Sequence, residues 1–188
     1  MTTLVGTRRF TVDEYHRMAE VGILKPDDRV ELVAGDVIPM APMSSRHAAA
    51  VRKIAEIFQR LLALSGRALV SVQCPVRLDD HSEPQPDVAL LRIKSDRYAD
   101  AHPTPSDVFL VIEVAQSSLG FDRDVKFPQY ARAGVLEAWL VNLEAQQVEV
   151  FREPGPLGYG AKTVGRKGQV LAPQNFSDVT VAVDDLLA

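Results

Sequence analysis

The sequence predicts an α/β protein in which a central mixed β-sheet is flanked by helices. Two short, almost wholly apolar runs, 88–93 and 108–115, have the pattern of central strands that are covered on both faces. The segment 48–64 repeats apolar residues at helical spacing and lies between predicted strands. One sheet with helices against it is the simplest architecture that buries these faces. Because 188 residues is a typical length for one domain, we expect a single domain over 1–188.

A short helix and a hairpin are expected first along the chain. Thr11 can cap a helix over 11–21, with Glu14 three residues later as its partner in a capping box. Apolar residues within 29–40 stand on both sides of a turn at 34–36, which is the pattern of a β-hairpin.

The longest predicted helix covers 48–64 and has one apolar and one charged face. Ser44 or Ser45 is expected to cap it. Alternating apolar residues over 69–78 then predict a strand with one buried face. Cys74 falls within that strand, so we expect a small buried hydrophobic residue there rather than a nucleophile.

The second half of the chain predicts more strands and one further helix. A turn rich in aspartate and proline is expected over 79–86. From Pro154 onward, glycine and proline predict loop with one or two weak edge strands. Between these segments we expect strands over 88–93, 108–115, 136–142 and 148–152, and a short helix over 124–133 that Gly134 ends.

Charge and composition restrict the class of protein. A formal net charge of -4 argues against a surface coated with positive charge for tight non-specific DNA binding. It does not exclude a nuclease, because carboxylates at a site would bind cations and basic residues can cluster on one face. A single cysteine excludes an intramolecular disulfide and an all-cysteine zinc site. Without a secretory signal or a run of about 18 apolar residues, a cytoplasmic protein with no membrane segment is expected.

Two carboxylates stand where apolar residues are expected. Asp87 opens a predicted strand, and Glu113 lies in the middle of the apolar strand 108–115. A carboxylate buried there needs a cation, a hydrogen-bonding partner or a proton. A purely structural ion pair of Glu113 with Arg123 or Arg132 is one alternative. The other is a divalent-cation site, because two carboxylates on neighbouring strands provide its ligands.

Lys126 is the third residue of this candidate site. Its segment follows the strand that carries Glu113, and a helix there would fold back over the end of that strand. Beside a metal and a phosphate, a lysine stabilises developing negative charge or helps to orient the attacking water. The alternative is a solvated lysine on the surface of that helix.

A metal site at Asp87 and Glu113 also predicts the pKa values of the two acids. Without metal, both pKa values should be raised, because mutual repulsion and burial each disfavour the charged form.

Seven segments of the chain form an ordered set that covers roughly residues 10–152. They are 29–36, 40–42 followed by His47, 83–87, 110–114, 122–130, 131–135 and 138–141. No segment is specific by itself, but the ordered set is, and it resembles the restriction endonucleases of the Uma type. Asp87 after Pro86, with Glu113 on the next strand, also resembles the wider PD-(D/E)XK nuclease signature.

The resemblance implies a restriction-endonuclease-like fold and metal-dependent cleavage of DNA. Asp87 and Glu113 would bind Mg²⁺ or Mn²⁺, since ligand oxygens favour hard cations over zinc. Lys126 would be the catalytic lysine, moved to a helix from the usual position two residues after the glutamate, which Ala115 occupies. A homodimer is expected by analogy with nucleases that pair to cut both strands.

Further residues match positions of the same family. Glu31, in the predicted hairpin, would be an additional acid at the site, or else a glutamate on the strand surface. His47 would contact a phosphate or carry a proton, or else only cap the long helix. Tyr130 lies one helical turn beyond Lys126 and is expected to pack, and Trp139 is expected in the core.

Pro128 departs from the pattern of the family. Proline removes a backbone donor and fits only the first turn of a helix. The helix is therefore expected to start near Lys126 rather than Asp122, which would rotate Lys126 relative to the acids.

Three functions are consistent with the sequence. The first is a Mg²⁺- or Mn²⁺-dependent endodeoxyribonuclease. The second is a catalytically degenerate nuclease-fold module that binds DNA or a protein without turnover, which the acidic charge and Pro128 favour. The third is a metal-dependent hydrolase of a small phosphate ester, which is weaker because no glycine-rich phosphate loop is evident. Metal-dependent nicking of plasmid DNA that Asp87→Ala abolishes would separate the first from the second.

Overall fold

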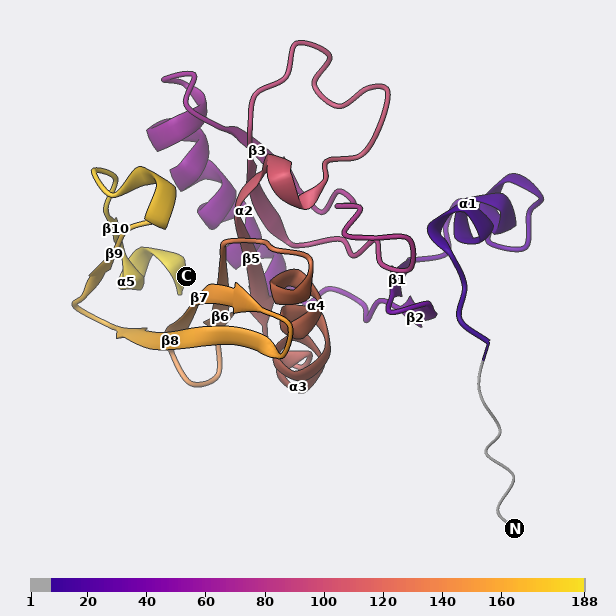
Figure 1. Ribbon diagram of the computed structural model, residues 1–188. Helices are drawn as coiled ribbons and strands as arrows, with labels where there is room; N and C mark the ends of the chain where they lie inside the picture. The colour runs from indigo at the N-terminus through magenta and orange to yellow at the C-terminus, as the bar shows by residue number, and fades with distance from the viewer. Residues whose placement is uncertain (1–7, 188) are drawn as a thin grey trace.

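The computed structural model describes residues 8–187 and has a six-stranded mixed sheet at its centre (Figure 1). The strand order is β3-β4-β5-β6-β7-β8. β5 and β6 are parallel, and each other neighbouring pair is antiparallel. The strands are β3 (Leu69–Val72), β4 (Val88–Leu91), β5 (Val108–Ala115), β6 (Glu137–Asn142), β7 (Gln147–Gly155) and β8 (Gly158–Arg166).

Two apolar cores lie on opposite faces of this sheet, because successive side chains of a strand point to opposite sides. One core joins α2 (Ser45–Phe58) to Ile112 and Trp139. The other joins α4 (Phe127–Arg132) to Val111. Trp139 is fully buried, so its expected place in the core is confirmed. The predicted architecture, a mixed sheet flanked by helices, is confirmed as well.

The connection between the parallel strands β5 and β6 is a helical crossover, as a parallel pair requires. It begins with α3 (Leu119–Phe121), continues as a π-helical segment, η3 (Asp122–Lys126), and ends with α4. Glu113 alternates with Ile112 along β5, so its side chain points to the face that α4 covers. The crossover thus brings its own polar residues against the strand that carries Glu113.

The start expected near Lys126 is confirmed for the regular α-helix, since α4 begins at Phe127 with Lys126 as its N-cap. Helical structure nevertheless begins earlier than expected, at Leu119. Pro128 lies inside this helical run, as the second residue of α4. The Phe127 N–H donates to the carbonyl oxygen of Asp122, five residues back. A proline lacks the N–H of a regular helix, and its ring would collide with the carbonyl four residues back. The wider π turn accommodates it.

The N-terminal elements lie to one side of the main sheet (Figure 1). The capping box of α1 (Val12–Glu20) is confirmed, since Thr11 Oγ1 accepts from the Glu14 N–H and Glu14 Oε2 accepts from the Thr11 N–H. The hairpin of β1 (Val30–Val33) and β2 (Asp36–Pro39) is also confirmed, and it forms a two-stranded sheet of its own.

The long helix starts earlier than expected, at Ser45, and Ser44 caps it by accepting the His47 N–H at 3.1 Å. It continues as a π-helical segment, η1 (Gln59–Ala63).

The strand expected over 69–78 is too long, because β3 ends at Val72. Gln73 has a φ of 50°, and Pro75 offers no N–H to a strand ladder. Cys74 follows this break and is exposed, so its expected burial is wrong.

The tail expected after Pro154, a loop with one or two weak edge strands, is partly wrong. β7 extends to Gly155, and β8, at the edge of the sheet, is a nine-residue strand that pairs with it as a long antiparallel hairpin. The pairing with β7 provides the hydrogen bonds that the weak strand propensity of a glycine-rich segment does not predict. The tail is completed by β9 (Val170–Leu171), β10 (Val181–Ala182) and α5 (Val183–Leu186).

Across residues 8–187, no helix combines the length and the apolar character that crossing a membrane requires.

Candidate metal-binding active site

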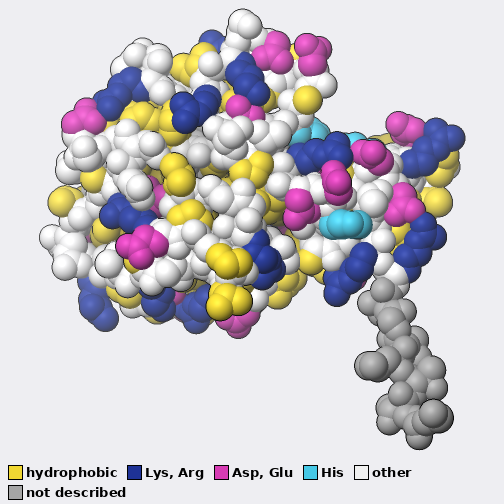
Figure 2. All heavy atoms as spheres, viewed as in Figure 1, with side chains coloured by type: hydrophobic (Ala, Val, Ile, Leu, Met, Phe, Trp, Pro, Cys, Tyr) yellow, Lys and Arg dark blue, Asp and Glu magenta, His cyan; other side chains and the backbone are white. Residues whose placement is uncertain are grey.

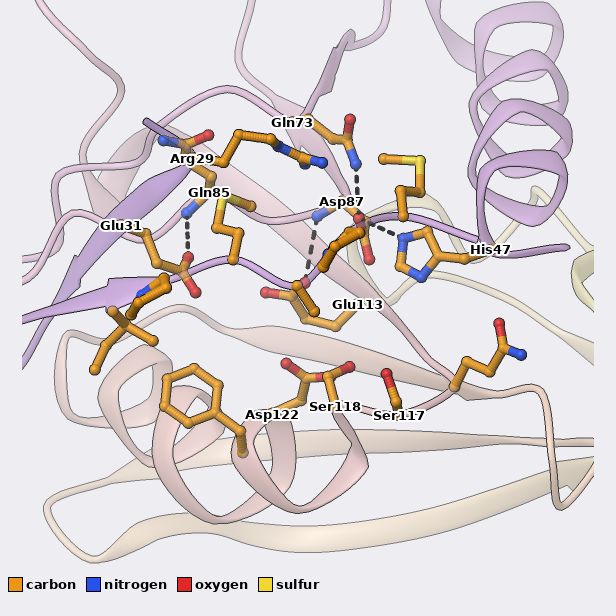
Figure 3. Close-up of a pocket in the computed structure, with 18 of the residues that line it drawn as sticks. Arg29, Glu31, His47, Gln73, Gln85, Asp87, Glu113, Ser117, Ser118 and Asp122 are labelled. Atoms are coloured by element: carbon orange, nitrogen blue, oxygen red, sulfur yellow. Dashed lines mark hydrogen bonds and ion pairs between the residues drawn. The ribbon is translucent and has the colours of Figure 1, made fainter. Parts of the chain in front are cut away.

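A cavity of about 500 Å³ opens where β1, the start of β4 and the end of β5 meet the crossover helix (Figure 3). Acidic side chains from different elements point into it, as the close-up shows. The candidate residues that line it are Glu31, His47, Asp87, Glu113 and Lys126. The structure therefore brings together all five residues that the sequence analysis selected.

Asp87 and Glu113 are held beside each other by backbone hydrogen bonds. Asp87 directly precedes Val88, which pairs with Ile112, so Asp87 stands next to Glu113 across the two antiparallel strands. The Asp87 N–H donates to Glu113 Oε2 at 3.3 Å, and the Val114 N–H donates to Asp87 Oδ2 at 2.9 Å. Each carboxylate is thus fixed by the backbone of the opposite strand.

Asp87 is surrounded by groups that favour its charged form. His47 Nε2 lies 3.0 Å and Gln73 Nε2 lies 3.1 Å from Asp87 Oδ1 (Figure 3). Burial raises the pKa of Asp87. The hydrogen bond and charge of His47, together with the Val114 N–H and Gln73, lower it by more, so the pKa lies below its ordinary value. The expectation of a raised pKa at Asp87 is wrong, because these donors outweigh burial.

His47 takes part in the site rather than in capping alone. Ser44 provides the side-chain cap of α2, which leaves the His47 ring to bond Asp87. This hydrogen bond raises the pKa of His47, against the opposing effect of burial.

Glu113 is 3% exposed and its carboxylate is deep in the cluster. Lys126 Nζ lies 2.7 Å from Glu113 Oε1, and the Tyr130 hydroxyl donates to the same oxygen at 2.7 Å. Burial raises the pKa of Glu113 to about 8, and the nearby charges of Asp122, Asp87 and Glu31 act in the same direction, against the effect of Lys126. The raised pKa expected for Glu113 is confirmed.

Lys126 reaches into the cavity from η3. It is 4% exposed, and its Nζ also lies 3.2 Å from Glu31 Oε2. Burial lowers the pKa of Lys126, but the carboxylates of Glu113, Glu31 and Asp122 outweigh burial and raise it. Lys126 is therefore a buried ammonium, and the alternative of a solvated surface lysine is wrong.

Glu31 is buried too, and β1 delivers it from outside the main sheet. The Gln85 N–H donates to Glu31 Oε2 at 2.9 Å, which ties the hairpin to the segment before Asp87 (Figure 3). The alternative of a strand-surface glutamate is wrong.

Arg123, offered as a structural partner of Glu113, instead lies 2.5 Å from Glu149, measured from its Nη2 to Oε1. The cation that pairs with Glu113 is Lys126.

Three contributors were missed or misjudged from the sequence. Asp122 is 5% exposed and lines the cavity, and burial raises its pKa to about 6. Its spacing of four residues from Lys126 could have predicted this place, because residues four apart share one face of a helix. Tyr130 was expected only to pack, yet its hydroxyl bonds Glu113. Gln73 could not be found, because its role depends on the early end of β3.

The charge balance of the cluster fits a bound divalent cation. Four buried carboxylates, Glu31, Asp87, Glu113 and Asp122, line one cavity with Lys126 and His47. A surplus of carboxylates in a buried site requires protons or a cation. Carboxylate oxygens are ligands that Mg²⁺ and Mn²⁺ prefer. Asp87 and Glu113, fixed side by side, are the residues best placed to hold such an ion.

Comparisons with known proteins show the family and the fold of this chain. The model of a family described as "Uma2: Putative restriction endonuclease" matches residues 12–184. Among solved structures, the fold is similar to that of a crystal structure described as "a putative nuclease belonging to DUF820" from Anabaena variabilis ATCC 29413. The TM-score is 0.76 at 16% sequence identity, over 95% of this chain and 97% of that chain. No curated protein matches the sequence.

Proposed function

This chain belongs to the Uma2 family, which is described as "Putative restriction endonuclease", and we propose that it is a divalent-metal-dependent endodeoxyribonuclease. The observation that carries the proposal is the buried cluster in which Asp87 and Glu113 lie side by side and Lys126 contacts Glu113. Paired acids can hold a metal ion and a lysine beside them can stabilise developing negative charge, which suits hydrolysis of a phosphodiester.

In this proposal, each residue of the cluster has a separate task. Asp87 and Glu113 hold Mg²⁺ or Mn²⁺, which would polarise the phosphate and lower the pKa of a water molecule. Lys126 stabilises the negative charge that develops on the phosphate under attack. Glu31 and Tyr130 keep the ammonium of Lys126 and the carboxylate of Glu113 in place.

His47 contributes to the same site through Asp87. Its ring holds the Oδ1 oxygen of Asp87 and leaves Oδ2 to the Val114 N–H. We propose that it orients this carboxylate, and its raised pKa suits a group that gives a proton to a departing oxygen.

Nicking of supercoiled plasmid DNA tests the activity. We expect cleavage in Mg²⁺ or Mn²⁺ that chelation stops. Asp87→Asn and Glu113→Gln should abolish cleavage and weaken Mn²⁺ binding, while Glu31→Gln should weaken it less. Glu56→Gln, an exposed acid on α2, is the matched control and should behave as the wild type. Cleavage that survives Asp87→Asn would refute the proposal.

The alternative is a catalytically degenerate module of the same fold that binds DNA or a protein without turnover. The net charge of -4 and the closed ion pairs of Lys126 favour it. A preparation that binds Mn²⁺ at Asp87 and binds DNA, but leaves the plasmid intact, would support this module. By analogy with nucleases that pair to cut both strands, we further propose a homodimer, which light scattering with size-exclusion chromatography measures.

A further inference from the structure

A second cluster of metal-binding side chains lies away from the acidic cavity, where α1 meets the segments that follow β3 and β4. It consists of His16 on α1, Glu83 before β4, and His102 after β4. One ligand atom from each residue lies within 4.8 Å of the other two. In the space-filling view, histidine and acidic side chains gather where the N-terminal part joins the larger body (Figure 2).

Glu83 is the unusual member of this cluster, because it is 3% exposed and half of its carboxylate has no partner. Its Oε1 lies 2.7 Å from His16 Nε2. Its Oε2 is buried and makes no hydrogen bond within the described part of the chain. A buried carboxylate oxygen without a partner is costly, so this oxygen has a lone pair free for a cation, a water molecule or a proton.

The backbone around these residues is anchored independently of their side chains. The Glu83 N–H donates to the carbonyl of Leu32 at 2.8 Å. The carbonyl of Pro103, next to His102, accepts from the Arg77 N–H at 2.9 Å. His16 is carried by α1, whose capping box fixes its start. Three separate segments thus each bring one possible metal-ligand atom to the same place.

We propose that His16, Glu83 and His102 bind a divalent transition-metal ion of the Zn²⁺ class. Two imidazoles and one carboxylate suit Zn²⁺, and they leave one position for water. The set differs from the oxygen ligands of the acidic cavity, which suit Mg²⁺ and Mn²⁺. Ligands of tetrahedral zinc lie roughly 3.4 Å apart when each is about 2.0–2.1 Å from the ion. The exposed side chain of His102 has the freedom to close the remaining gap.

The consequence of binding is mechanical, because α1 has little apolar contact to hold it. Val12 is its one buried residue, and the Tyr15 hydroxyl ties it to the Val30 carbonyl. A metal ion shared by His16 and the segments around Glu83 and His102 would fasten α1 to the body. Zinc would therefore protect α1 against local opening.

Zinc titration of the whole protein, by competition with a chromophoric chelator, tests this site. We expect one Zn²⁺ per chain to bind in excess Mg²⁺. His102→Ala, at an exposed position that leaves folding intact, should weaken binding by ~10-fold or more, as should His16→Ala. His81→Ala, at another exposed histidine, is the matched control and should leave the Zn²⁺ affinity unchanged. Asp87→Asn should also leave it unchanged, which separates this site from the acidic cavity.

Hydrogen exchange of the α1 amides is the second measurement. Zn²⁺ should slow exchange in the wild type and in His81→Ala but not in His102→Ala. Equal Zn²⁺ affinity in wild type and His102→Ala would overturn the proposal, and so would Zn²⁺ binding that Asp87→Asn removes. Absence of any bound Zn²⁺ would show that His16 and Glu83 form a simple ion pair. None of these outcomes depends on DNA cleavage.

Discussion

The ammonium of Lys126 lies 2.7 Å from the Glu113 carboxylate, and both side chains are buried. The two residues come from different elements, a π-helical segment and the centre of a strand. Ala115, two residues after Glu113, is buried in the core and offers no cation. A helix thus provides the positive charge that this strand lacks.

Replacement of Lys126 by methionine should remove cleavage and keep the shape of the site. Methionine fills a similar volume without a charge, so the phosphate under attack loses its stabilising cation. We expect a fall in the cleavage rate of ~100-fold or more, the scale for removal of one charge-stabilising donor. Mn²⁺ binding, measured by calorimetry, should persist.

Arg123→Gln is the comparison for Lys126→Met, because Arg123 lies on the same segment but bonds Glu149 instead. It should retain most of the cleavage activity. An unchanged rate in Lys126→Met would remove the lysine from the mechanism.

The metal-free protein should lose stability as the pH rises toward 8. The folded state holds the pKa of Glu113 at about 8, above its ordinary 4.5, so folding favours its protonated form. That contribution is complete below about pH 4.5 and is lost as the pH rises through about 8. Asp122, with a pKa of about 6, acts in the same direction at lower pH. Urea unfolding across this range measures the slope.

Glu113→Gln should flatten the slope between pH 6 and 8, because glutamine does not titrate. Asp87 has the opposite sign, since its pKa is lowered, and its stabilisation is lost only as the pH falls below its ordinary range. A slope of the same size in Glu113→Gln would contradict this assignment.

A pair of Tyr→Phe variants separates a role in the site from a role in stability. Tyr130→Phe and Tyr159→Phe each remove one hydroxyl donor, to Glu113 Oε1 at 2.7 Å and to the Val135 carbonyl at 2.9 Å. Each should lower the free energy of unfolding by about 1–2 kcal/mol. Only Tyr130→Phe should also change the Mn²⁺ affinity and the cleavage rate. Equal metal affinity in both variants would show that Tyr130 serves stability alone.

Pro128→Ala should make the protein more stable and less active. Alanine restores a backbone donor and favours a regular helix over the π turn, with a gain of ~1 kcal/mol out of the ~3 kcal/mol that proline costs inside a helix. A regular helix would turn Lys126 away from Glu113 and slow cleavage. Gln129→Ala, at the next position, is the control. Full activity in Pro128→Ala would show that the π turn does not position the lysine.

Local patterns in the sequence predicted much of the fold. The capping box at Thr11, the apolar run of β5 and the helical spacing of α2 each agree with the structure, because short-range chemistry determines them. The opposite holds for β8, which forms only because β7 lies beside it. Such tertiary pairing leaves little trace in a glycine-rich segment.

In the candidate site, too, the features set by the local sequence could be predicted and those set by distant segments could not. Asp87 and Glu113 could be found, because a carboxylate in an apolar strand stands out. The lowered pKa of Asp87 could not, since it depends on His47 and Gln73, which reach it from distant segments. The effect of Pro128 was predicted only in part, because the π turn before α4 leaves Lys126 in contact with Glu113.

The hairpin that carries Glu31 could be exchanged to change the acidic cavity. Asp87 and Glu113 are built into the main sheet, so changes near them disturb its core. Glu31 arrives on a separate two-stranded sheet that is tied to the body through Gln85 and Glu83. Exchanging this hairpin between relatives would alter the acidity of the cavity without repacking the sheet. In the proposed metal site, this hairpin is therefore the segment to exchange in order to change the metal preference.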